Sequence, residues 1–336
     1  MEARIENCIY GVLCGDSLGG RYEFNKNLTK LREKLDQDIA DCNGKLEILG
    51  GGIMTLVPGQ PTDDSEMTVA LAWSLGRMKG YNREDIFQNY LKWHQSRPVD
   101  QGIATRMAFF GAHNIYDMLR NSLTHNTKSL SNGCLMRCAP LGIYGARMST
   151  DERSGARMLE ACKKDCELTN PSNIAIEAVQ VYCSAIRIGI LTGLASDAYH
   201  EALKVAKKDG LIEKIIVRGA LKGTTSVPLE TGEEVSFESG EKIGYLGIAL
   251  AHAFRELMNF ESFEKSMERI LRHGGDTDTN CSIAGGLLGA VYGGRNGFIP
   301  ESWKRTVLEA KTFRVRAYPL IEPQAFPKMI ELLKKI

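Results

Sequence analysis

The stretch PTDDSEMTVALAWSLGRM, residues 61–78, joins an acidic start to a regular repeat of apolar side chains. Met67, Leu71, Leu75 and Met78 recur every three or four residues, and this spacing places side chains on one face of an α-helix. The stretch therefore predicts a helix with a buried face, preceded by a cluster of acidic residues.

The same helical periodicity extends over most of the chain. Four further segments show it: residues 84–95, 244–257, 261–273 and 282–294. Residues 173–191, NIAIEAVQVYCSAIRIGIL, are apolar almost all round, which is typical of a buried helix. The clearest period-2 segment is residues 225–242, TSVPLETGEEVSFESGEK, which predicts a short hairpin or a surface loop. Because no internal repeat or Pro/Ser-rich linker divides the chain, we predict one all-α domain over residues 1–336.

The composition excludes several classes of protein. Hydrophobic residues make up 43% of the 336 residues and charged residues 25%, so the chain can bury a large core. The formal net charge of +1 gives no indication of a basic surface that would bind nucleic acid or an anionic membrane. No apolar run reaches the roughly 18 residues of a membrane span, and the N-terminal run is cut at Gly15 and Asp16, unlike a signal peptide. We expect a soluble, cytoplasmic protein that is a monomer.

Nine cysteines are scattered along the chain. None forms a C-x-x-C pair, and the two C-x3-C spacings lack the nearby Cys or His pair that a zinc site needs. We therefore expect reduced cysteines that behave mostly as small buried apolar residues.

A second acidic helix start lies near the C-terminus, where residues 273–280 read HGGDTDTN before an apolar helical segment. Capping is the simplest interpretation of both starts. Asp63 and Glu66 have the spacing of a capping box, and Asp278 is in the position of an N-cap.

A metal site is the alternative interpretation, because each start has more oxygen ligands than a cap needs. The residues concerned are Thr62, Asp63, Asp64, Asp276, Asp278 and Thr279. A helix dipole offsets only about 0.3–1 kcal/mol of the repulsion between adjacent carboxylates, whereas bound cations neutralise the charge far better. All these ligands are hard oxygens, which favours Mg²⁺, Mn²⁺ or Ca²⁺. If the two starts meet in space, four carboxylates could hold two ions about 3.5–4 Å apart.

Five segments together resemble the ADP-ribosylglycohydrolase family, of the dinitrogenase-reductase-activating type. They are GVLCGDSLGGRYEF (11–24), PTDDSEMTVALAWSL (61–75), YLKWHQSRPVDQGIATRM (90–107), SNGCLMRCAPLG (131–142) and HGGDTDTNCSIAGGLLGAVYG (273–293). The resemblance runs in the family's order from about Ile9 to Tyr292. It implies an orthogonal helical bundle with a two-ion site, usually Mg²⁺ or Mn²⁺, at the bottom of a cleft that binds ADP-ribose.

The resemblance also implies roles for individual residues. The expected metal ligands are Thr62, Asp63, Asp64, Asp276, Asp278 and Thr279. Glu23 matches an acidic residue that in some relatives contacts a metal or positions the attacking water, and a surface glutamate after a loop is the alternative. Either Glu23 or Asp278 is expected to manage the proton of that water.

The expected substrate site is assembled from several loops. Residues 129–137, SLSNGCLMR, match a loop that in relatives wraps the ADP-ribose, and Gly102 falls where relatives bring the backbone close to phosphate. The residues expected to contact the substrate are Gly102, Ser129, Asn132, Gly133, Asn170, Gly274 and Gly275. Arg137 either faces phosphate or forms a structural ion pair.

One departure from the family pattern bears on the chemistry. Many relatives carry a histidine in a Thr-His segment that lines the cleft, whereas this chain has Asn170 in the segment LTNPSN. Asparagine donates and accepts hydrogen bonds but does not titrate. A proton-transfer or stacking role of that histidine is therefore in doubt for this chain.

The leading hypothesis is a hydrolase that cleaves the C1″ glycosidic bond between ADP-ribose and an ADP-ribosylated protein or other acceptor, with two Mg²⁺ or Mn²⁺ ions. A non-catalytic ADP-ribose-binding or structural module of the same fold is the second hypothesis, and Asn170 is its main support. A metal-dependent phosphoesterase is the third. The sequence leaves open the linkage, the native metal and whether residues 225–242 select the macromolecular substrate.

Overall fold

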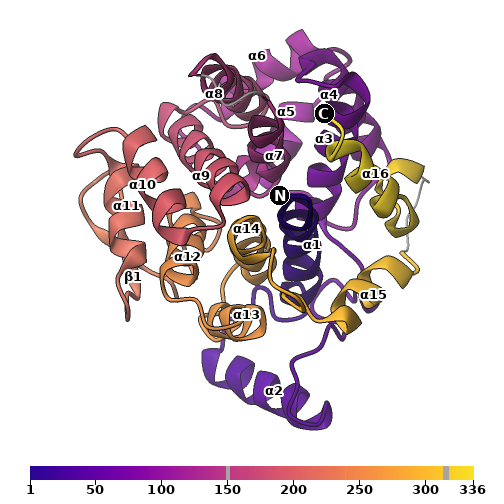
Figure 1. Ribbon diagram of the computed structural model, residues 1–336, viewed down its shortest axis with the longest axis vertical. Helices are drawn as coiled ribbons and strands as arrows, with labels where there is room; N and C mark the ends of the chain where they lie inside the picture. The colour runs from indigo at the N-terminus through magenta and orange to yellow at the C-terminus, as the bar shows by residue number, and fades with distance from the viewer. Residues whose placement is uncertain (149–151, 239, 313–317) are drawn as a thin grey trace.

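The molecule is built almost entirely from α-helices (Figure 1). The computed structural model describes residues 1–148, 152–238, 240–312 and 318–336. Helices account for 63% of the structure, which confirms the predicted all-α helical bundle. In chain order the α-helices are α1 (Glu2–Gly19), α2 (Leu28–Asp41), α3 (Asp63–Met78), α4 (Arg83–Gln95), α5 (Ile103–Phe109), α6 (Ile115–His125), α7 (Ala139–Arg147), α8 (Glu152–Cys166), α9 (Asn173–Thr192), α10 (Ala195–Val205), α11 (Leu211–Ala220), α12 (Leu246–Met258), α13 (Phe263–Leu271), α14 (Thr277–Tyr292), α15 (Glu301–Glu309) and α16 (Phe326–Leu333). The other described elements are the 3₁₀ helices η1 (Asn132–Cys134), η2 (Pro319–Ile321) and η3 (Pro323–Ala325) and the strands β1 (Ser226–Pro228) and β2 (Glu234–Ser236).

Within residues 61–78, helix α3 begins at Asp63. Met67, Leu71 and Leu75 are fully buried in the core, as the helical spacing predicts, whereas Met78 in the last turn is 47% exposed. Burial of such a side chain contributes about 1.5–3 kcal/mol, so this face holds α3 firmly inside the bundle. The acidic start of the helix is consequently carried into the interior as well, with Asp63 and Asp64 both buried.

Helix α9 confirms the prediction of a buried helix for residues 173–191. Its length and composition would suit a membrane span, with a mean hydropathy of 1.6 over 18 residues, but 67% of that window is buried inside the protein. It packs against α7, α8, α10 and α14. Its apolar surface is therefore covered by neighbouring helices.

The packing of α1 against α14 determines where the acidic residues lie. The two helices lie side by side at the centre of the molecule (Figure 1). They run antiparallel, because Gly11 lies against Gly285 and Gly19 against Asp278. A Cβ atom at Gly11 would lie 2.1 Å from the carbonyl oxygen of Gly285, and one at Gly15 would lie 2.4 Å from that of Cys281. Only glycine permits this backbone-to-backbone approach. The close approach brings the C-terminal end of α1 against the first turn of α14.

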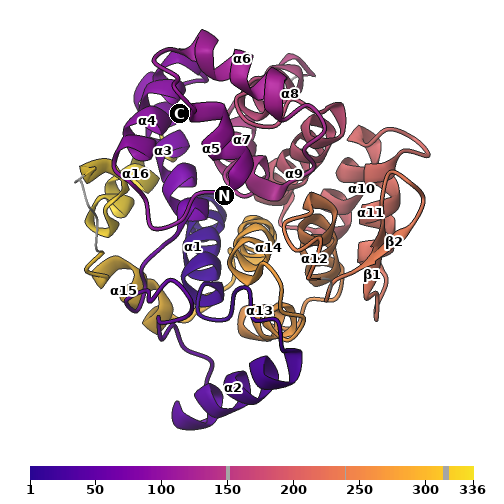
Figure 2. The same cartoon turned by 180° about the vertical axis from the view of Figure 1, so that it is seen from behind.

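The predicted hairpin is present within residues 225–242. Strands β1 and β2 are antiparallel and pair Val227 with Val235, both of which are buried. Figure 2 shows the hairpin at the edge of the molecule, beside α11 and α12. Ser239 of the predicted segment lies outside the described residues.

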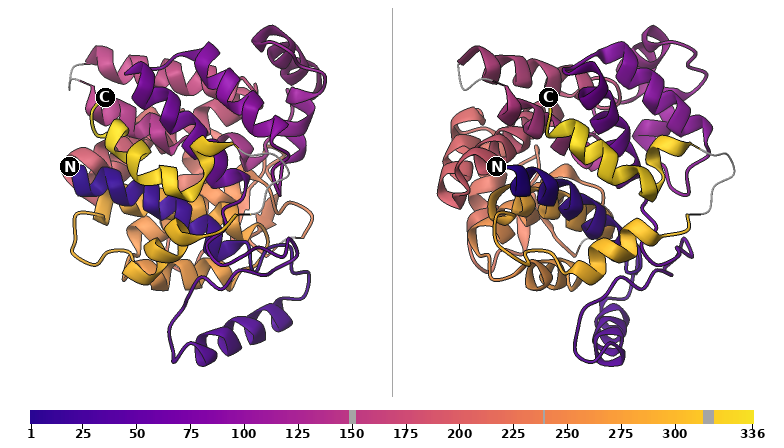
Figure 3. Two further views of the ribbon diagram at one scale, coloured as in Figure 1. Left: turned by 90° about the vertical axis from the view of Figure 1, so that its right-hand side faces the viewer. Right: turned by 45° about the vertical axis from the view of Figure 1, so that its right-hand side comes forward.

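Helix α2 projects from the rest of the bundle (Figure 3). The side chain of Asn27 caps its N-terminus by accepting a hydrogen bond from the Lys30 amide at 3.0 Å. The buried side chains of Leu31 and Leu35 attach it to the core. Its first residue, Leu28, packs against the loop that precedes α14, where a Cβ atom on Gly274 would lie 2.7 Å from Leu28 Cδ2.

Candidate active site

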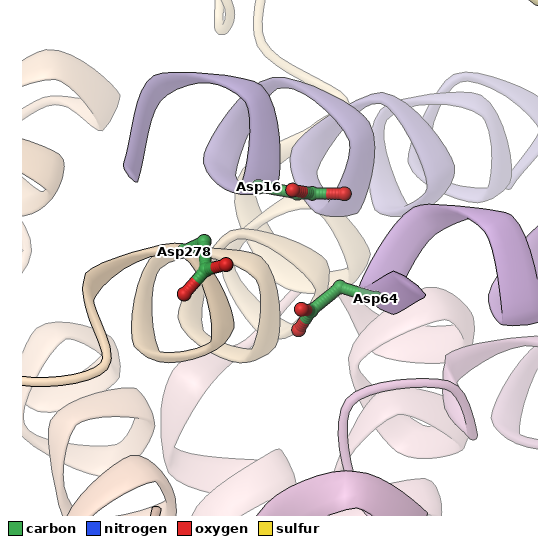
Figure 4. A group of neighbouring side chains, drawn as sticks. All are labelled: Asp16, Asp64 and Asp278. Carbon is green, nitrogen blue, oxygen red and sulfur yellow. The ribbon is translucent and has the colours of Figure 1, made fainter. Parts of the chain in front are cut away.

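Three helix ends meet inside the protein and bring carboxylates together. Asp16 comes from α1, Asp64 from the first turn of α3 and Asp278 from the first turn of α14 (Figure 4). Each offers a carboxylate oxygen, and these oxygens all lie within 4.8 Å of one another. The Thr279 hydroxyl also donates a hydrogen bond to Asp64 Oδ2 at 3.3 Å. The two acidic helix starts are therefore direct neighbours in space.

A second group of carboxylates shares Asp278 with the first. It consists of Glu23, Asp276 and Asp278, whose ligand oxygens also lie within 4.8 Å of one another. Glu23 lies in the turn that follows α1 and is buried, so the alternative interpretation as a surface glutamate is wrong. Each of the two groups could hold a metal ion, and Asp278 belongs to both.

The electrostatics of this cluster are unfavourable without a cation. Burial, followed by the charge of Asp276, raises the pKa of Glu23 to about 10. Burial and then the charge of Asp16 raise the pKa of Asp64 well above its usual value, and burial and then the charge of Glu23 do the same for the pKa of Asp278. Two like charges 4 Å apart repel by about 4 kcal/mol in such surroundings. The site must therefore hold protons or cations.

Two oxygen atoms in the cluster lack hydrogen bonds. Glu23 Oε2 and Asp64 Oδ1 are buried, and no donor among the described residues reaches either of them. An unpaired buried polar atom costs about 1–3 kcal/mol, so native proteins rarely leave one without a partner. Hard divalent cations prefer carboxylate oxygens, so the donor set fits such an ion.

The capping interpretation of the two acidic starts is wrong in its details. The N-cap residues are Thr62 and Asp276, one and two positions before the aspartates that the sequence suggested, and neither side chain caps its own helix. Asp16 replaces the missing cap of α3. It accepts hydrogen bonds from the Thr62 amide at 3.0 Å, the Thr62 hydroxyl at 2.8 Å and the Ser65 amide at 3.0 Å. Asp16 therefore holds the first turn of α3 in place from a different helix.

Asp276 is held by the loop that carries η1. Asn132 Nδ2 donates a hydrogen bond to Asp276 Oδ2 at 2.7 Å, and the Asn132 amide donates to the Gly244 carbonyl at 2.9 Å. Gly274 and Gly275 form the turn before Asp276 with φ angles of +67° and +79°, a region that side chains rarely adopt. The turn directs Asp276 and Asp278 toward Glu23.

Asp63, which precedes Asp64 in the first turn of α3, links the cluster to Gly102. The Gly102 amide donates a hydrogen bond to Asp63 Oδ2 at 3.2 Å, and Gly102 itself is exposed at the start of α5. Asp63 belongs to neither of the two groups whose ligand oxygens lie within 4.8 Å of one another among the described residues. The hydrogen bond to Asp63 places Gly102, whose backbone is predicted to contact phosphate, beside the acidic cluster. Asp63 lies outside both carboxylate groups.

Asn170 lies beneath the loop that the resemblance assigns to ADP-ribose. Its Nδ2 donates to Ser131 Oγ at 3.0 Å and approaches Ser129 Oγ at 3.5 Å, while its Oδ1 accepts from the Thr169 hydroxyl at 2.7 Å. Asn170 is fully buried, whereas Ser129 and Gly133 are half-buried. Asn170 therefore supports the Ser129–Gly133 loop through its contacts with the two serine hydroxyls.

Arg137 forms the structural ion pair of the two alternatives. Its Nε donates to Asp165 Oδ2 at 3.0 Å, and both side chains are completely buried. The same guanidinium donates to the Gly133 carbonyl at 3.0 Å and to the Thr169 hydroxyl at 2.9 Å. Because it is engaged on all sides, Arg137 supports the loop and does not face solvent.

Two acidic residues of the site escaped the sequence analysis. Asp16 was visible as a charged residue at the end of the apolar run that begins at Cys8, next to Gly15. Asp100 lies two residues before the predicted Gly102, and its charge adds to burial in raising the pKa of Glu23 and of Asp63. Burial and the charge of Asp276 in turn raise the pKa of Asp100. Both residues contribute to the negative potential of the cluster.

Comparison with known proteins gives a consistent result. The sequence model of the family described as ADP-ribosylglycohydrolase matches residues 1–328. The protein L543 of Acanthamoeba polyphaga mimivirus, provisionally named an ADP-ribosyl glycohydrolase, is 28% identical over 98% of both chains. The ADP-ribosyl-dinitrogen reductase glycohydrolase of Rhodospirillum rubrum is 24% identical over 87% of this chain and 86% of its own. A solved structure titled ADP-ribosylglycohydrolase-related protein complex shares the fold, with a TM-score of 0.66 and 22% identity over 99% of this chain and 96% of that one.

Proposed function

Because the chain belongs to the ADP-ribosylglycohydrolase family, we propose that it is a metal-dependent hydrolase that releases ADP-ribose from an ADP-ribosylated acceptor. The observation that carries the proposal is the pair of carboxylate groups joined at Asp278. The relative from Rhodospirillum rubrum is named for an acceptor that is a protein, which supports an ADP-ribosylated protein as the substrate here.

We assign the cation ligands to both carboxylate groups. Asp64, Asp278 and Thr279 would contribute to one position and Glu23, Asp276 and Asp278 to the other, with Thr62 and Asp63 at the margin. Mg²⁺ and Mn²⁺ suit a donor set made entirely of hard oxygens. When bound, such cations supply a polarised water and an anchor for ribose hydroxyls.

The protein's own groups then orient the substrate and move protons. Glu23 is the best candidate for the base, because Oε2 has no partner among the described residues and Asp278 is shared between the two groups. Glu23 would take one proton from the attacking water while the hydroxyl joins C1″ and the glycosidic bond breaks, and the same proton would then pass from Glu23 to the acceptor heteroatom. The transition state has oxocarbenium character, so nearby carboxylates stabilise it. The Ser129–Gly133 loop and Gly102 would hold the ADP-ribose.

Product analysis tests the proposal. ADP-ribosylated peptides would be incubated with the protein in Mg²⁺, in Mn²⁺ and in EDTA, beside the Asp64→Asn variant and a Glu33→Gln control on the exposed face of α2. We expect free ADP-ribose from the wild type and the control, and none in EDTA or from Asp64→Asn. AMP as the product would instead identify a phosphoesterase. Tight ADP-ribose binding without any product would identify a non-catalytic module.

A further inference from the structure

A surface cavity of about 560 Å³ lies where α4 ends and α5 begins. Its charged lining groups include Arg97, Asp100 and Arg106. Asp100 lies near the acidic cluster, since its charge adds to burial in raising the pKa of Glu23 and of Asp63. The cavity therefore adjoins the candidate active site and carries two arginines beside it.

Both arginines are exposed and available to a ligand. Neither guanidinium has a hydrogen-bond or ion-pair partner among the described residues. Arg97 is the second residue after α4 and has a φ angle of +57°, at a position where glycine is usual. No contact of its own side chain within the described residues compensates for this unfavourable conformation. Arginine side chains in such surroundings bind carboxylates or phosphates of a partner.

Helix α5 presents an exposed apolar face next to this cavity. Ile103 and Phe110 are 72% and 74% exposed, and Val99 in the cavity lining is 40% exposed. Ile103 and Phe110 are seven positions apart and Arg106 is three positions from Ile103, so these side chains lie along one side of α5. An exposed apolar patch with charged groups at its rim is typical of an interaction site. We call Arg97, Val99, Ile103, Arg106 and Phe110 the α5 surface.

The loop assigned to ADP-ribose contacts the other side of α5. A Cβ atom on Gly133 would lie 3.6 Å from Thr105 Oγ1, and Thr105 is buried. Two positions turn a helix by about 200°, so Thr105 lies opposite Ile103. With the ADP-ribose part of a substrate in that loop, the α5 surface remains free for the acceptor part.

We infer that the α5 surface binds the acceptor polypeptide at a segment with acidic and apolar side chains, an inference that rests on the proposed function. Carboxylates of that segment pair with Arg97 and Arg106, and its apolar side chains cover Ile103 and Phe110. Charge complementarity favours an acidic segment, because the two guanidiniums have no partner among the described residues. The α5 surface thus selects among acceptors and leaves the binding of free ADP-ribose unchanged.

Peptides with different flanking residues test the inference. Each carries one ADP-ribosylated arginine or serine, flanked on both sides by Glu and Leu, by Gln and Leu, or by Glu and Ser. The proteins are the wild type, Arg97→Gln/Arg106→Gln, Ile103→Ser/Phe110→Ser and a control, Arg305→Gln, at an exposed position of α15. Fluorescence anisotropy in EDTA measures the Kd of each peptide without turnover, and release of ADP-ribose in Mg²⁺ measures kcat/KM.

We expect the wild type and the control to bind the Glu/Leu peptide about threefold to tenfold more tightly than the Gln/Leu peptide. The arginine double variant should lose this preference, and high salt should weaken it because exposed charges are screened. The Ile103→Ser/Phe110→Ser variant should lose a preference of about threefold to tenfold for Leu over Ser in the flanks. The Kd of free ADP-ribose should change by less than about twofold in every variant.

Four results would overturn the inference. One is equal affinity of the wild type for the three kinds of flank, and another is an equal loss on all peptides in the arginine variant. Weaker binding of free ADP-ribose in that variant would assign Arg97 and Arg106 to the phosphates. Tighter binding of an ADP-ribosylated oligonucleotide than of any peptide would assign them to nucleic acid. A wild type that shows the expected preferences but releases no ADP-ribose in Mg²⁺ would support the α5 surface and refute the hydrolase.

Discussion

Replacement of Asp16 by alanine separates a structural carboxylate from the metal-binding ones. Asp16 belongs to one of the two carboxylate groups, yet its oxygens accept hydrogen bonds from the Thr62 amide, the Thr62 hydroxyl and the Ser65 amide. If Asp16 acts mainly as the cap of α3, its removal should destabilise the protein even without metal.

The magnitude follows from the groups that lose a partner. Asp16→Ala leaves two buried amides, those of Thr62 and Ser65, without an acceptor, at about 1–3 kcal/mol each. The Thr62 hydroxyl already approaches Asp64 Oδ2 at 3.3 Å and can turn toward it. Removing a buried carboxylate whose pKa burial raises to about 6 offsets part of this loss. We expect the free energy of unfolding to fall by about 2–3 kcal/mol.

Asp64→Asn is the matched control and should act in the opposite direction. Asp64 Oδ1 has no partner among the described residues, and its carboxylate is repelled by Asp16 and Asp63. Removing that charge should therefore stabilise the metal-free protein. It should also abolish the stabilisation by metal, which in the wild type amounts to about 2.7 kcal/mol at a hundred times the Kd.

Urea unfolding in EDTA and in excess Mg²⁺ measures both effects. The reasoning requires opposite signs for Asp16→Ala and Asp64→Asn in EDTA. If Asp16→Ala raised the stability of the metal-free protein as Asp64→Asn does, Asp16 would be a metal-site carboxylate and its capping role would be refuted.

Three further predictions follow from the structure. The first concerns pH: because the pKa of Glu23 is raised to about 10, its contribution to metal-free stability is complete below about pH 4.5 and is lost as the pH rises toward 10. Urea midpoints measured in EDTA should fall over that pH range. Excess Mg²⁺ should reverse the trend, because Mg²⁺ binding needs ionised carboxylates. Urea midpoints in EDTA that do not change with pH would contradict the raised pKa of Glu23. The second is that Gly11→Ala should lower the free energy of unfolding by about 3 kcal/mol, because the added methyl group would clash with α14. Gly155→Ala is the control: it lies in open space on α8 and should raise the free energy of unfolding by about 0.5–1 kcal/mol. Equal urea midpoints for the two variants would refute the packing argument. The third is that Arg137→Met should cost about 3–5 kcal/mol by leaving Asp165 buried and unpaired, while Mg²⁺ affinity, measured by calorimetry, stays within about threefold because Arg137 touches no carboxylate of the cluster.

Periodicity was sufficient to predict six of the α-helices, namely α3, α4, α9, α12, α13 and α14, and the places where acidic residues begin two of them. The apolar spacing of Met67, Leu71 and Leu75 depends only on the geometry of one helix, so it can be recognised within a single segment of sequence. The hairpin within residues 225–242 could be predicted for a similar reason, because its period-2 pattern depends only on the geometry of neighbouring residues. The excess of carboxylates at both helix starts pointed to a cation, since local capping needs only one oxygen.

Only the tertiary structure decided which of these groups meet. The cap of α3 comes from Asp16 on another helix, so the local rule placed the helix start one residue too late. Glu23 joins Asp276 and Asp278 because α1 lies against α14 through backbone contacts that glycine alone allows. These pairings connect residues that are far apart in the chain, and their energies depend on burial and on close approach. Sequence spacing carries no information on either, whereas the packing of the helices determines both.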